Sequence, residues 1–447
     1  MVLQYFVFPF PGAISTNLYP KKRHISMPGC LYGLIFMSFA FLVVVLLIRT
    51  LSDCGYGSFH TKLNTGKQCA REKDSSVLDT NANVTEMGKH KLNVKERMQH
   101  VREMCSRPST KVNVLFKERD AICYCDIPKG ASTFMHKILE HYFFNQGHGH
   151  VTSKLVTNEC KVFTNKSSHS HTYSFMFVKE PYSRLFSVYE TYFFLPSDYW
   201  DLIGTDVVHK VRQNATSTSK ALGHDVTFAE LVKYVVVLHD QHNLTYRNLA
   251  PMYTLCNPCD TTYDFIGKVE TLSENFEMLV SEWIKKGLVH NDTVPVKEVE
   301  LEVNYRLSLG WIQKLYKMYN KYKSSISHFK LLQRFWSSSQ IKGKISKYYE
   351  IPYFKDDSEE IDKATFTRSF QSAMYASKSN IDELKAQRQE ALEQAYGTVP
   401  FELMIKLKKV LKHDFLIFDY DDQPVYLFDR PVNSDVNQKF HDYFQGL

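Results

Sequence analysis

The stretch Ala121–Leu139, AICYCDIPKGASTFMHKIL, decides the fold class of this chain. It begins with Ala121–Ile127, a mainly apolar and aromatic run that is typical of a buried strand. A loop of small residues with one lysine follows at Pro128–Thr133, and from Phe134 the apolar residues recur with helical spacing. This order predicts an anion-binding turn, because backbone N–H groups and the positive end of the helix dipole face the same point.

Three side chains of this turn are suited to bind an anion. Lys129 adds a full positive charge, and Ser132 and Thr133 offer hydroxyl groups. The spacing G-x-x-x-x-G-K-[ST] of the nucleoside triphosphate loop is absent, so the turn is not a P-loop of that type. A turn of this kind is more often structural than functional when it stands alone. Its assignment therefore depends on the motifs found later in the chain.

A second strand–turn–helix unit follows about 50 residues later. Tyr173–Val178 is an apolar strand, Lys179-Glu180-Pro181 interrupts it, and Tyr182–Phe194 has apolar residues at helical spacing. Two such units in succession predict an α/β domain with a central parallel sheet. Both turns would lie beyond the carboxyl ends of their strands, where ligands of such sheets bind.

The remaining pattern predicts further elements. Expected strands are Val112–Lys117 and Tyr263–Gly267, with a late strand or packed tail at Phe415–Tyr420; expected helices are Val94–Met104, Val226–His239 after a cap at Asp225, Leu272–Lys286, Trp311–Lys323, Ile381–Tyr396 and Phe401–His413.

An N-terminal membrane anchor is predicted at residues 30–48, which are 19 residues without a charge. At ~1.5 Å per residue this run just spans a hydrocarbon core of ~30 Å. It starts late and lacks a small-x-small cleavage site, which disfavours a cleaved signal peptide. Lys21, Lys22 and Arg23 precede it. The positive-inside rule then predicts a single-pass type II protein with residues 1–29 in the cytosol.

The rest of the chain divides into a stem and a globular part. Residues 49–110 are polar and predict a luminal stem, and residues 111–447 form the predicted globular domain. Within that domain, residues 337–397 are highly charged and poor in large aliphatic side chains. They predict an insertion or a partly disordered arm.

Glycosylation sequons and cysteines agree with a luminal location. Five N-x-[ST] sequons all follow the anchor, at Asn83, Asn165, Asn214, Asn243 and Asn291. Eight of the nine cysteines also follow it, where disulfides can form. The pair Cys256-x-x-Cys259 has no second Cys or His pair to complete a zinc site, so it favours a disulfide, either within the pair or to a cysteine beyond it.

The formal net charge of +7 limits the kinds of binding partner that can be expected. Nucleic acid is not expected for a luminal protein. An acidic polysaccharide matches a modest basic surplus, and a solvated basic surface explains the charge equally well.

Several motifs taken together resemble one family. Pro128–Thr133, Phe177–Tyr189, Leu255–Cys259 and Tyr263–Leu272 look like successive signatures of the Golgi carbohydrate sulfotransferases, which include the chondroitin and dermatan 4-O-sulfotransferases and the glucuronyl 3-O-sulfotransferase. The resemblance covers roughly Ala121–Val280. It implies a P-loop-like sulfotransferase domain with the sulfate donor 3′-phosphoadenosine-5′-phosphosulfate (PAPS), and it implies no metal.

The resemblance also implies roles for the two turns. The first turn, Pro128, Lys129, Gly130, Ala131, Ser132 and Thr133, would hold the 5′-phosphosulfate, with Lys129 on the bridging oxygen. Lys179 and Ser187 would hold the 3′-phosphate. Negative charge grows on the leaving phosphate oxygen during sulfuryl transfer, and a preorganised cation stabilises it more in the transition state than in the ground state.

The acceptor hydroxyl needs a general base, and His150 occupies the place where the family has a His-Val pair. His148, His136 and Glu180 are the alternatives. Arg184 either binds substrate or forms a structural ion pair with Glu180.

The chain departs from the family at three places. Ser132-Thr133-Phe134 stands where the family usually has Cys-Thr-Asn, Lys179 stands for Arg before Glu-Pro, and Asn248-Leu249 stands for His-Trp. Lysine keeps the positive charge of arginine but cannot form two parallel hydrogen bonds to one phosphate group. Lysine in place of arginine at position 179 therefore predicts weaker binding of the 3′-phosphate.

The expected protein is a Golgi enzyme with a luminal catalytic domain that sulfates a glycan, at the 4-position of GalNAc in chondroitin or dermatan. The alternatives are 3-O-sulfation of glucuronate, 4-O-sulfation of GalNAc on the N-glycans of glycoproteins, and a catalytically silent relative that binds glycans. The departures keep the last alternative open. The acceptor, the disulfide pairing and the oligomeric state are not encoded in these motifs.

Overall fold

A computed structural model describes residues 93–105, 116–119, 122–144, 173–289, 296–354, 361–429, 441–444 and 447. The predicted cytosolic tail, the predicted anchor and the stem as far as residue 92 lie outside the described residues. Among the described residues, no helix has the length and apolarity needed to cross a membrane.

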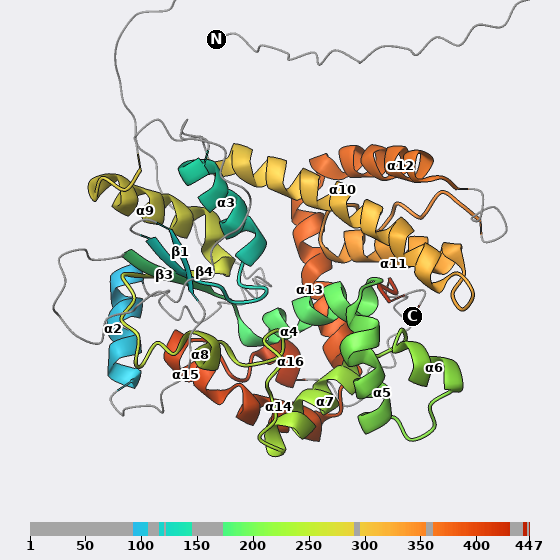
Figure 1. Cartoon of the computed structure of the whole chain (residues 1–447), viewed down its shortest axis with the longest axis horizontal. Coiled ribbons are helices and arrows are strands. Elements are labelled where there is room, and N and C mark those ends of the chain that lie inside the picture. Colours follow the sequence, from blue (N-terminus) through green and yellow to red (C-terminus); the bar gives the residue numbers. More distant parts are fainter. Residues whose placement is uncertain are drawn as a thin grey trace, which may run out of the picture. The chain divides into compact units, whose positions relative to one another are not determined.

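A four-stranded sheet with the order β1-β2-β3-β4 lies between two groups of helices (Figure 1). The strands are β1 (Phe116–Arg119), β2 (Ile122–Cys125), β3 (Tyr173–Val178) and β4 (Phe265–Lys268). The last three are parallel, whereas β1 pairs antiparallel with β2 at the edge. The prediction of an α/β fold with a central parallel sheet is therefore confirmed. Every residue of β2 and β3 is buried, as expected when helices cover both faces.

The helices fill the rest of the described chain. They are α2 (Val94–Met104), α3 (Ser132–Phe144), α4 (Pro181–Tyr189), α5 (Thr205–Val211), α6 (Ser217–Leu222), α7 (Phe228–Asp240), α8 (Met252–Cys256), α9 (Leu272–Lys285), α10 (Val296–Tyr322), α11 (His328–Ile341), α12 (Lys363–Ala376), α13 (Ile381–Gly397), α14 (Phe401–Val410), α15 (Lys412–Phe418) and α16 (Val425–Phe428).

Alternate side chains of the strands form two separate hydrophobic layers. On one face, Tyr124 stacks on Phe175 with ring centroids 4.9 Å apart, and α3 and α9 cover the pair. On the other face, Cys125, Met176 and Val178 pack against α2, α8 and α15. Figure 1 shows α3 and α9 on one side of the sheet and α2, α8 and α15 on the other. The period-2 alternation of β-strands produces both layers from the same short segments.

Helix α4 leads from the sheet into a further core. Its residues pack with α7, α13 and α14, and Phe228 of α7 meets Tyr396 of α13 with ring centroids 4.6 Å apart. Tyr396 also donates a hydrogen bond of 2.9 Å from its hydroxyl to the carbonyl of Tyr182. The C-terminal helices are thus fastened directly to the segment that follows the second turn.

Two of the alternatives predicted for the C-terminal region are wrong. A partly disordered arm does not describe residues 361–397, because α12 and α13 fold there and bury aromatic and small side chains in place of large aliphatic ones; Phe366, Phe370, Ala391 and Tyr396 are all buried. The helix predicted at Ile381–Tyr396 is confirmed as α13. The late strand offered as one alternative for Phe415–Tyr420 is instead helix α15, which ends at Phe418 before a C-cap at Asp419 with a left-handed φ of 53°. The other alternative, a packed tail, agrees with the burial of Phe415, Ile417 and Phe418.

Other predicted elements are confirmed with shifted ends. The helix expected at Val226–His239 is α7, but its cap is Thr227, which forms a capping box with Glu230. Asp225 instead pairs with Arg212 at 2.8 Å. The helix expected at Trp311–Lys323 is the last part of the longer α10.

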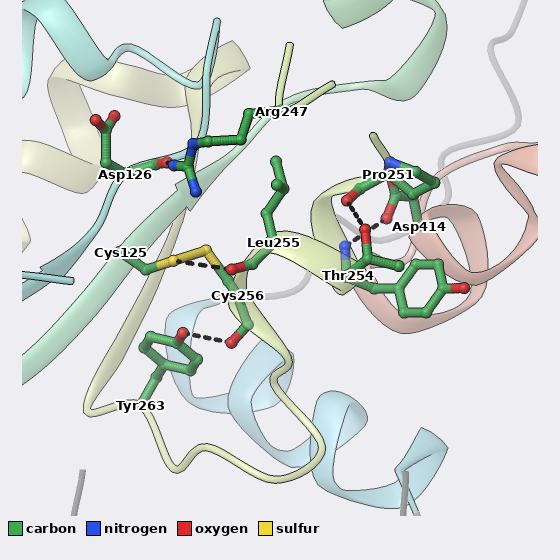
Figure 2. The surroundings of a disulfide bond; sticks show 10 residues. Cys125, Asp126, Arg247, Pro251, Thr254, Leu255, Cys256, Tyr263 and Asp414 are labelled. Atoms are coloured by element: carbon green, nitrogen blue, oxygen red, sulfur yellow. Dashed lines mark hydrogen bonds between the residues drawn. A yellow bond between two sulfur atoms is a disulfide. The ribbon is translucent and has the colours of Figure 1, made fainter. Parts of the chain in front are cut away.

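Each cysteine of the Cys256-x-x-Cys259 pair bonds to a cysteine far away in the sequence. Cys256 joins Cys125, and Cys259 joins Cys105. The alternative of a disulfide within the pair is therefore wrong, and neither thiol is left to bind zinc. Figure 2 shows the first bond linking the end of β2 to α8, with the hydroxyl of Tyr263 donating to the carbonyl of Cys256 at 2.6 Å.

The double variant Cys125→Ala/Cys256→Ala is expected to unfold more easily than the parent by about 2–5 kcal/mol, because the bond is buried and joins residues 131 positions apart. Urea denaturation of both proteins measures the loss. Cys105→Ala/Cys259→Ala is the matched control: its cysteines are 154 positions apart but only half-buried, so its loss should be smaller. A larger loss for the control would contradict the role given to burial.

Candidate active site

The first turn has a backbone conformation that side-chain-bearing residues rarely adopt. Lys129 and Ala131 have φ angles of 66° and 62°. Between them, a Cβ added at Gly130 would lie 2.6 Å from the carbonyl oxygen of Phe177, so only glycine fits against the end of β3. The amide of Met135 then donates to the carbonyl of Ala131, where α3 begins. Strained backbone of this kind clusters at functional sites.

The ammonium group of Lys129 lies within a group of charges. Its Nζ is 4.4 Å from the ring centroid of Tyr192. Burial lowers the pKa of Lys129 to about 7, and the positive charge of Lys342 adds to this effect, whereas the carboxylate of Glu190 opposes it. A lysine in such surroundings gains from a bound anion, because the anion restores the preference for the charged form.

The second turn brings together the two residues expected to bind one phosphate. Glu180 caps α4, with its carboxylate accepting from the amides of Tyr182 and Ser183 at 3.0 and 2.6 Å. Lys179 Nζ donates to Ser187 Oγ at 2.8 Å. Burial lowers the pKa of Lys179 to about 8. The structure therefore places Lys179 and Ser187 as neighbours, as their motif requires.

The sequence analysis missed one residue of this cluster, Arg388 on α13. Its Nη2 donates to Ser187 Oγ at 2.8 Å, and its guanidinium carbon lies 4.6 Å from the ring centroid of Phe186. The signal that could have found it is its spacing, because Ala391, Leu392 and Ala395 follow at i+3, i+4 and i+7 and are buried. Arg388 therefore lies beside the face of α13 that packs inward.

A buried carboxylate and two more lysines extend the cluster. Glu190 is 1% exposed, pairs with Lys342 Nζ at 2.8 Å and accepts from the hydroxyl of Ser338. Burial acts to raise the pKa of Glu190, but Lys342 and Arg388 outweigh it, so the net pKa is lowered. Lys344 donates to Ser308 at 2.7 Å, and burial lowers the pKa of Lys344 to about 8.

The cluster as a whole suits a ligand with several negative charges. Its cations are Lys129, Lys179, Lys342, Lys344 and Arg388, and its carboxylate is Glu190. Charge-assisted hydrogen bonds to phosphate-type oxygens would offset the desolvation of these cations. Among the described residues, no group of His, Cys, Asp and Glu side chains is arranged to hold a metal ion.

Two cavities lie apart from this cluster. One of about 800 Å³ is lined by Tyr173, Asp264 and Lys285, beside the amino-terminal ends of β3 and β4. The other, of about 480 Å³, is lined by Lys408, Lys412 and Asp421. The first lies at the end of the sheet opposite the two turns, and neither is lined by the residues assigned to donor binding.

The predicted general base, His150, and its alternative His148 lie outside the described residues. His136 lies with Nε2 3.4 Å from a carboxylate oxygen of Asp126. Both carboxylate oxygens of Glu180 accept backbone amides, and burial raises the pKa of Glu180 to about 7. The identity of the base stays a prediction.

Arg184 is buried and bonded to the backbone, which differs from the substrate contact or the ion pair with Glu180 that the sequence analysis offered. It is 3% exposed and donates to backbone carbonyls, including those of Pro128 at 3.0 Å and Ala250 at 2.9 Å. The expected ion pair with Glu180 is not present in the described part of the chain, because the carboxylate of Glu180 caps α4 instead. In this arrangement the side chain joins the first turn to the segment before α8.

Two of the five predicted sequons can be inspected. Asn214 and Asn243 are exposed, as attachment of a glycan requires, whereas Asn83, Asn165 and Asn291 lie outside the described residues.

The fold and the site define an α/β protein with basic turns after two adjacent parallel strands. Residues 112–321, just under half of the chain, match the model of the sulfotransferase family. Over this region the chain is similar to that family, and the curated relatives that it matches are carbohydrate sulfotransferases. The resemblance seen in the motifs is thereby confirmed.

Three relatives illustrate the extent of similarity. Carbohydrate sulfotransferase 11 of Rattus norvegicus is 26% identical over 231 residues, which are 47% of this chain and 66% of that protein. Carbohydrate sulfotransferase 14 of Danio rerio is 28% identical over 36% of this chain and 46% of that protein. Carbohydrate sulfotransferase 14 of Homo sapiens is 34% identical over 26% of this chain and 29% of that protein. The chain thus spans less than two thirds of the length of these relatives. No solved structure matches it significantly.

Arg184→Lys is expected to lower the free energy of unfolding by about 2 kcal/mol or more, because lysine cannot reach the backbone carbonyls that the guanidinium bonds. Urea denaturation gives the value. Arg247→Lys is the control, since Arg247 is half-buried and has one such bond, to the carbonyl of Asp126 at 2.8 Å. Equal losses in the two variants would contradict the structural role of Arg184.

Lys129→Met is expected to change stability in a pH-dependent way. Burial disfavours the charged lysine in the folded protein, so the penalty is fully present below pH about 7 and disappears towards pH 10.5, the ordinary pKa. The stability of the variant relative to the parent should therefore be greatest at about pH 6 and should decrease as the pH rises to about 10. Urea denaturation at three pH values across this range tests the trend, and a pH-independent difference would refute it.

Proposed function

We propose that this protein transfers the sulfuryl group of PAPS to a hydroxyl group of a glycan. The observation that carries the proposal is the convergence of two anion-binding turns at the carboxyl ends of β2 and β3. One turn presents Lys129 at the start of α3, and the other presents Lys179 bonded to Ser187. Because the two turns follow adjacent strands, together they suit a ligand that carries two anionic groups. A nucleoside phosphorylated at its 3′ and 5′ positions is such a ligand.

The turn Pro128–Thr133 is proposed to bind the 5′-phosphosulfate. Its backbone amides lie at the N-terminus of a 13-residue helix, and Ser132 and Thr133 add hydroxyl groups. Lys129 is proposed to contact the bridging oxygen, where charge accumulates as the bond to sulfur breaks. Lys129 has a pKa of about 7 in the protein without ligand, and an anion in this turn would favour its protonated form.

The 3′-phosphate is assigned to Lys179 and Ser187. Lys179 supplies charge, and the hydroxyl of Ser187 is held by donating to the carbonyl of Ser183 at 2.8 Å. His150 is proposed as the base that takes the proton of the acceptor hydroxyl. Because the transferred group passes between oxygen atoms with lysine and helix-end donors around it, the proposal requires no metal.

The proposed acceptor is the 4-position of GalNAc in chondroitin or dermatan, and the proposed location is the Golgi membrane with the catalytic domain in the lumen. Support comes from relatives that are named carbohydrate sulfotransferases and from the anchor and sequons in the sequence. Glucuronate 3-O-sulfation and GalNAc 4-O-sulfation on N-glycans are the alternatives within the same chemistry.

A catalytically silent glycan-binding protein is the alternative from another class. It is favoured by one observation, namely that Phe134 and Lys179 replace the residues usual in the family at both turns. The two functions differ in whether sulfate is transferred.

The test uses the full-length protein in detergent with labelled PAPS and four acceptors: desulfated chondroitin, dermatan, heparosan and a glucuronate-capped oligosaccharide. Label at the 4-position of GalNAc is expected. Label elsewhere would keep the reaction and change the acceptor. Absence of label on every acceptor would reject sulfation of chondroitin and dermatan and would leave the N-glycan acceptor and the silent relative.

Lys129→Ala is expected to reduce turnover by at least about 100-fold, because a preorganised charge at the leaving oxygen is lost. Lys137→Ala is the matched control, since Lys137 is exposed on α3, the helix that follows the turn of Lys129. Circular dichroism of both variants checks that they fold. Normal turnover of a folded Lys129→Ala protein would refute the role of Lys129.

A further inference from the structure

Two cations meet at one neutral oxygen atom beside the second turn. Lys179 Nζ and Arg388 Nη2 each lie 2.8 Å from Ser187 Oγ. The hydroxyl of Ser187 donates its hydrogen to the carbonyl of Ser183, so it accepts from both cations at once. Among the described residues, neither Lys179 nor Arg388 is in an ion pair with a carboxylate.

This arrangement is unfavourable without an anion. The charge of Arg388 is, after burial, the largest cause that lowers the pKa of Lys179, whereas the carboxylates of Glu270, Glu180 and Glu190 act to raise it. A hydroxyl oxygen cannot neutralise two positive charges. A phosphate group placed between them would neutralise both and would replace the repulsion by charge-assisted hydrogen bonds.

Arg388 is held firmly at this point by its own helix. Tyr396 of α13 donates to the carbonyl of Tyr182, and Gln387 donates to the carbonyls of Gln340 and Ile345 at 2.8 and 3.0 Å. The guanidinium also lies over the ring of Phe186. It makes one hydrogen bond to Ser187 and has further N–H groups to offer a ligand.

We propose that Arg388 is a third ligand of the 3′-phosphate of the nucleotide donor, beside Lys179 and Ser187. The proposal rests on the proposed function and adds a residue that lies outside the family match at residues 112–321. It also explains how a lysine can serve at position 179, where the family usually has an arginine. The guanidinium group that lysine lacks is supplied by Arg388, from a helix about 200 residues later in the chain.

The assignment predicts a selective effect on one phosphate. Adenosine 3′,5′-bisphosphate has the 3′-phosphate and adenosine 5′-phosphate lacks it, so their affinity ratio measures the 3′-phosphate contacts alone. Arg388→Ala in the full-length protein should weaken the bisphosphate about 10- to 100-fold and leave the monophosphate unchanged. Titration calorimetry with both nucleotides gives the two values.

Three further variants make the outcome specific. Lys129→Ala should weaken both nucleotides, because the first turn holds the 5′-phosphate. Lys385→Ala, on an exposed position of α13, should change neither. Arg388→Lys keeps the charge and should recover part of the ratio; it also serves if Arg388→Ala does not fold.

The possible failures are distinguishable. If the parent protein binds neither nucleotide, or binds both equally, the proposed donor site itself is wrong, and this inference falls with it. If the parent prefers the bisphosphate but the Arg388 variants keep that preference, or lose both nucleotides equally, the donor site stands and the role of Arg388 is overturned.

Discussion

The close approach of the first turn to the end of β3 is the constraint on which the site depends. The carbonyl of Phe177 occupies the space that a side chain at Gly130 would need, so the loop can pass only with glycine there. Lys129 and Ala131 on either side adopt left-handed φ angles as the chain turns into α3. This contact sets the turn after β2 directly beside the one after β3, and the buried guanidinium of Arg184 donates to the carbonyl of Pro128.

Electrostatics then decides what the paired turns are suited for. Burial of these cations is unfavourable, as the lowered pKa values of Lys129, Lys179 and Lys344 show. Part of the stabilisation from the hydrophobic layers must therefore offset the cost of burying these charges, which an anionic ligand would reduce. The glutamate at position 190 reduces the repulsion by pairing with Lys342. A fixed arrangement of cations of this kind would suit the proposed sulfuryl transfer, because electrostatic catalysis requires preorganised charges.

The C-terminal helices are part of this site as well as of the core. Helix α13 lies against α4, and α11 supplies Ser338 to Glu190. The region matched by the family model ends at residue 321, before either helix. The division between a motif-bearing region and a charged C-terminal arm, which the composition suggests, does not correspond to a division in the packed structure. Residues from both parts contact the same serine hydroxyl.

The sequence by itself determined the strand–turn–helix units, the parallel sheet and the likeness to carbohydrate sulfotransferases, because apolar periodicity and short motifs are local properties of the chain. It also selected Lys129, Lys179 and Ser187 as candidate donor-binding residues, because they lie within those motifs. Only the tertiary structure decided the partners of Cys256 and Cys259, the backbone-bonding role of Arg184 and the place of Arg388. These depend on contacts between residues far apart in the chain, 66 positions for Arg184 and Ala250 and 201 for Arg388 and Ser187, and no local pattern encodes which distant side chain will fill a given space.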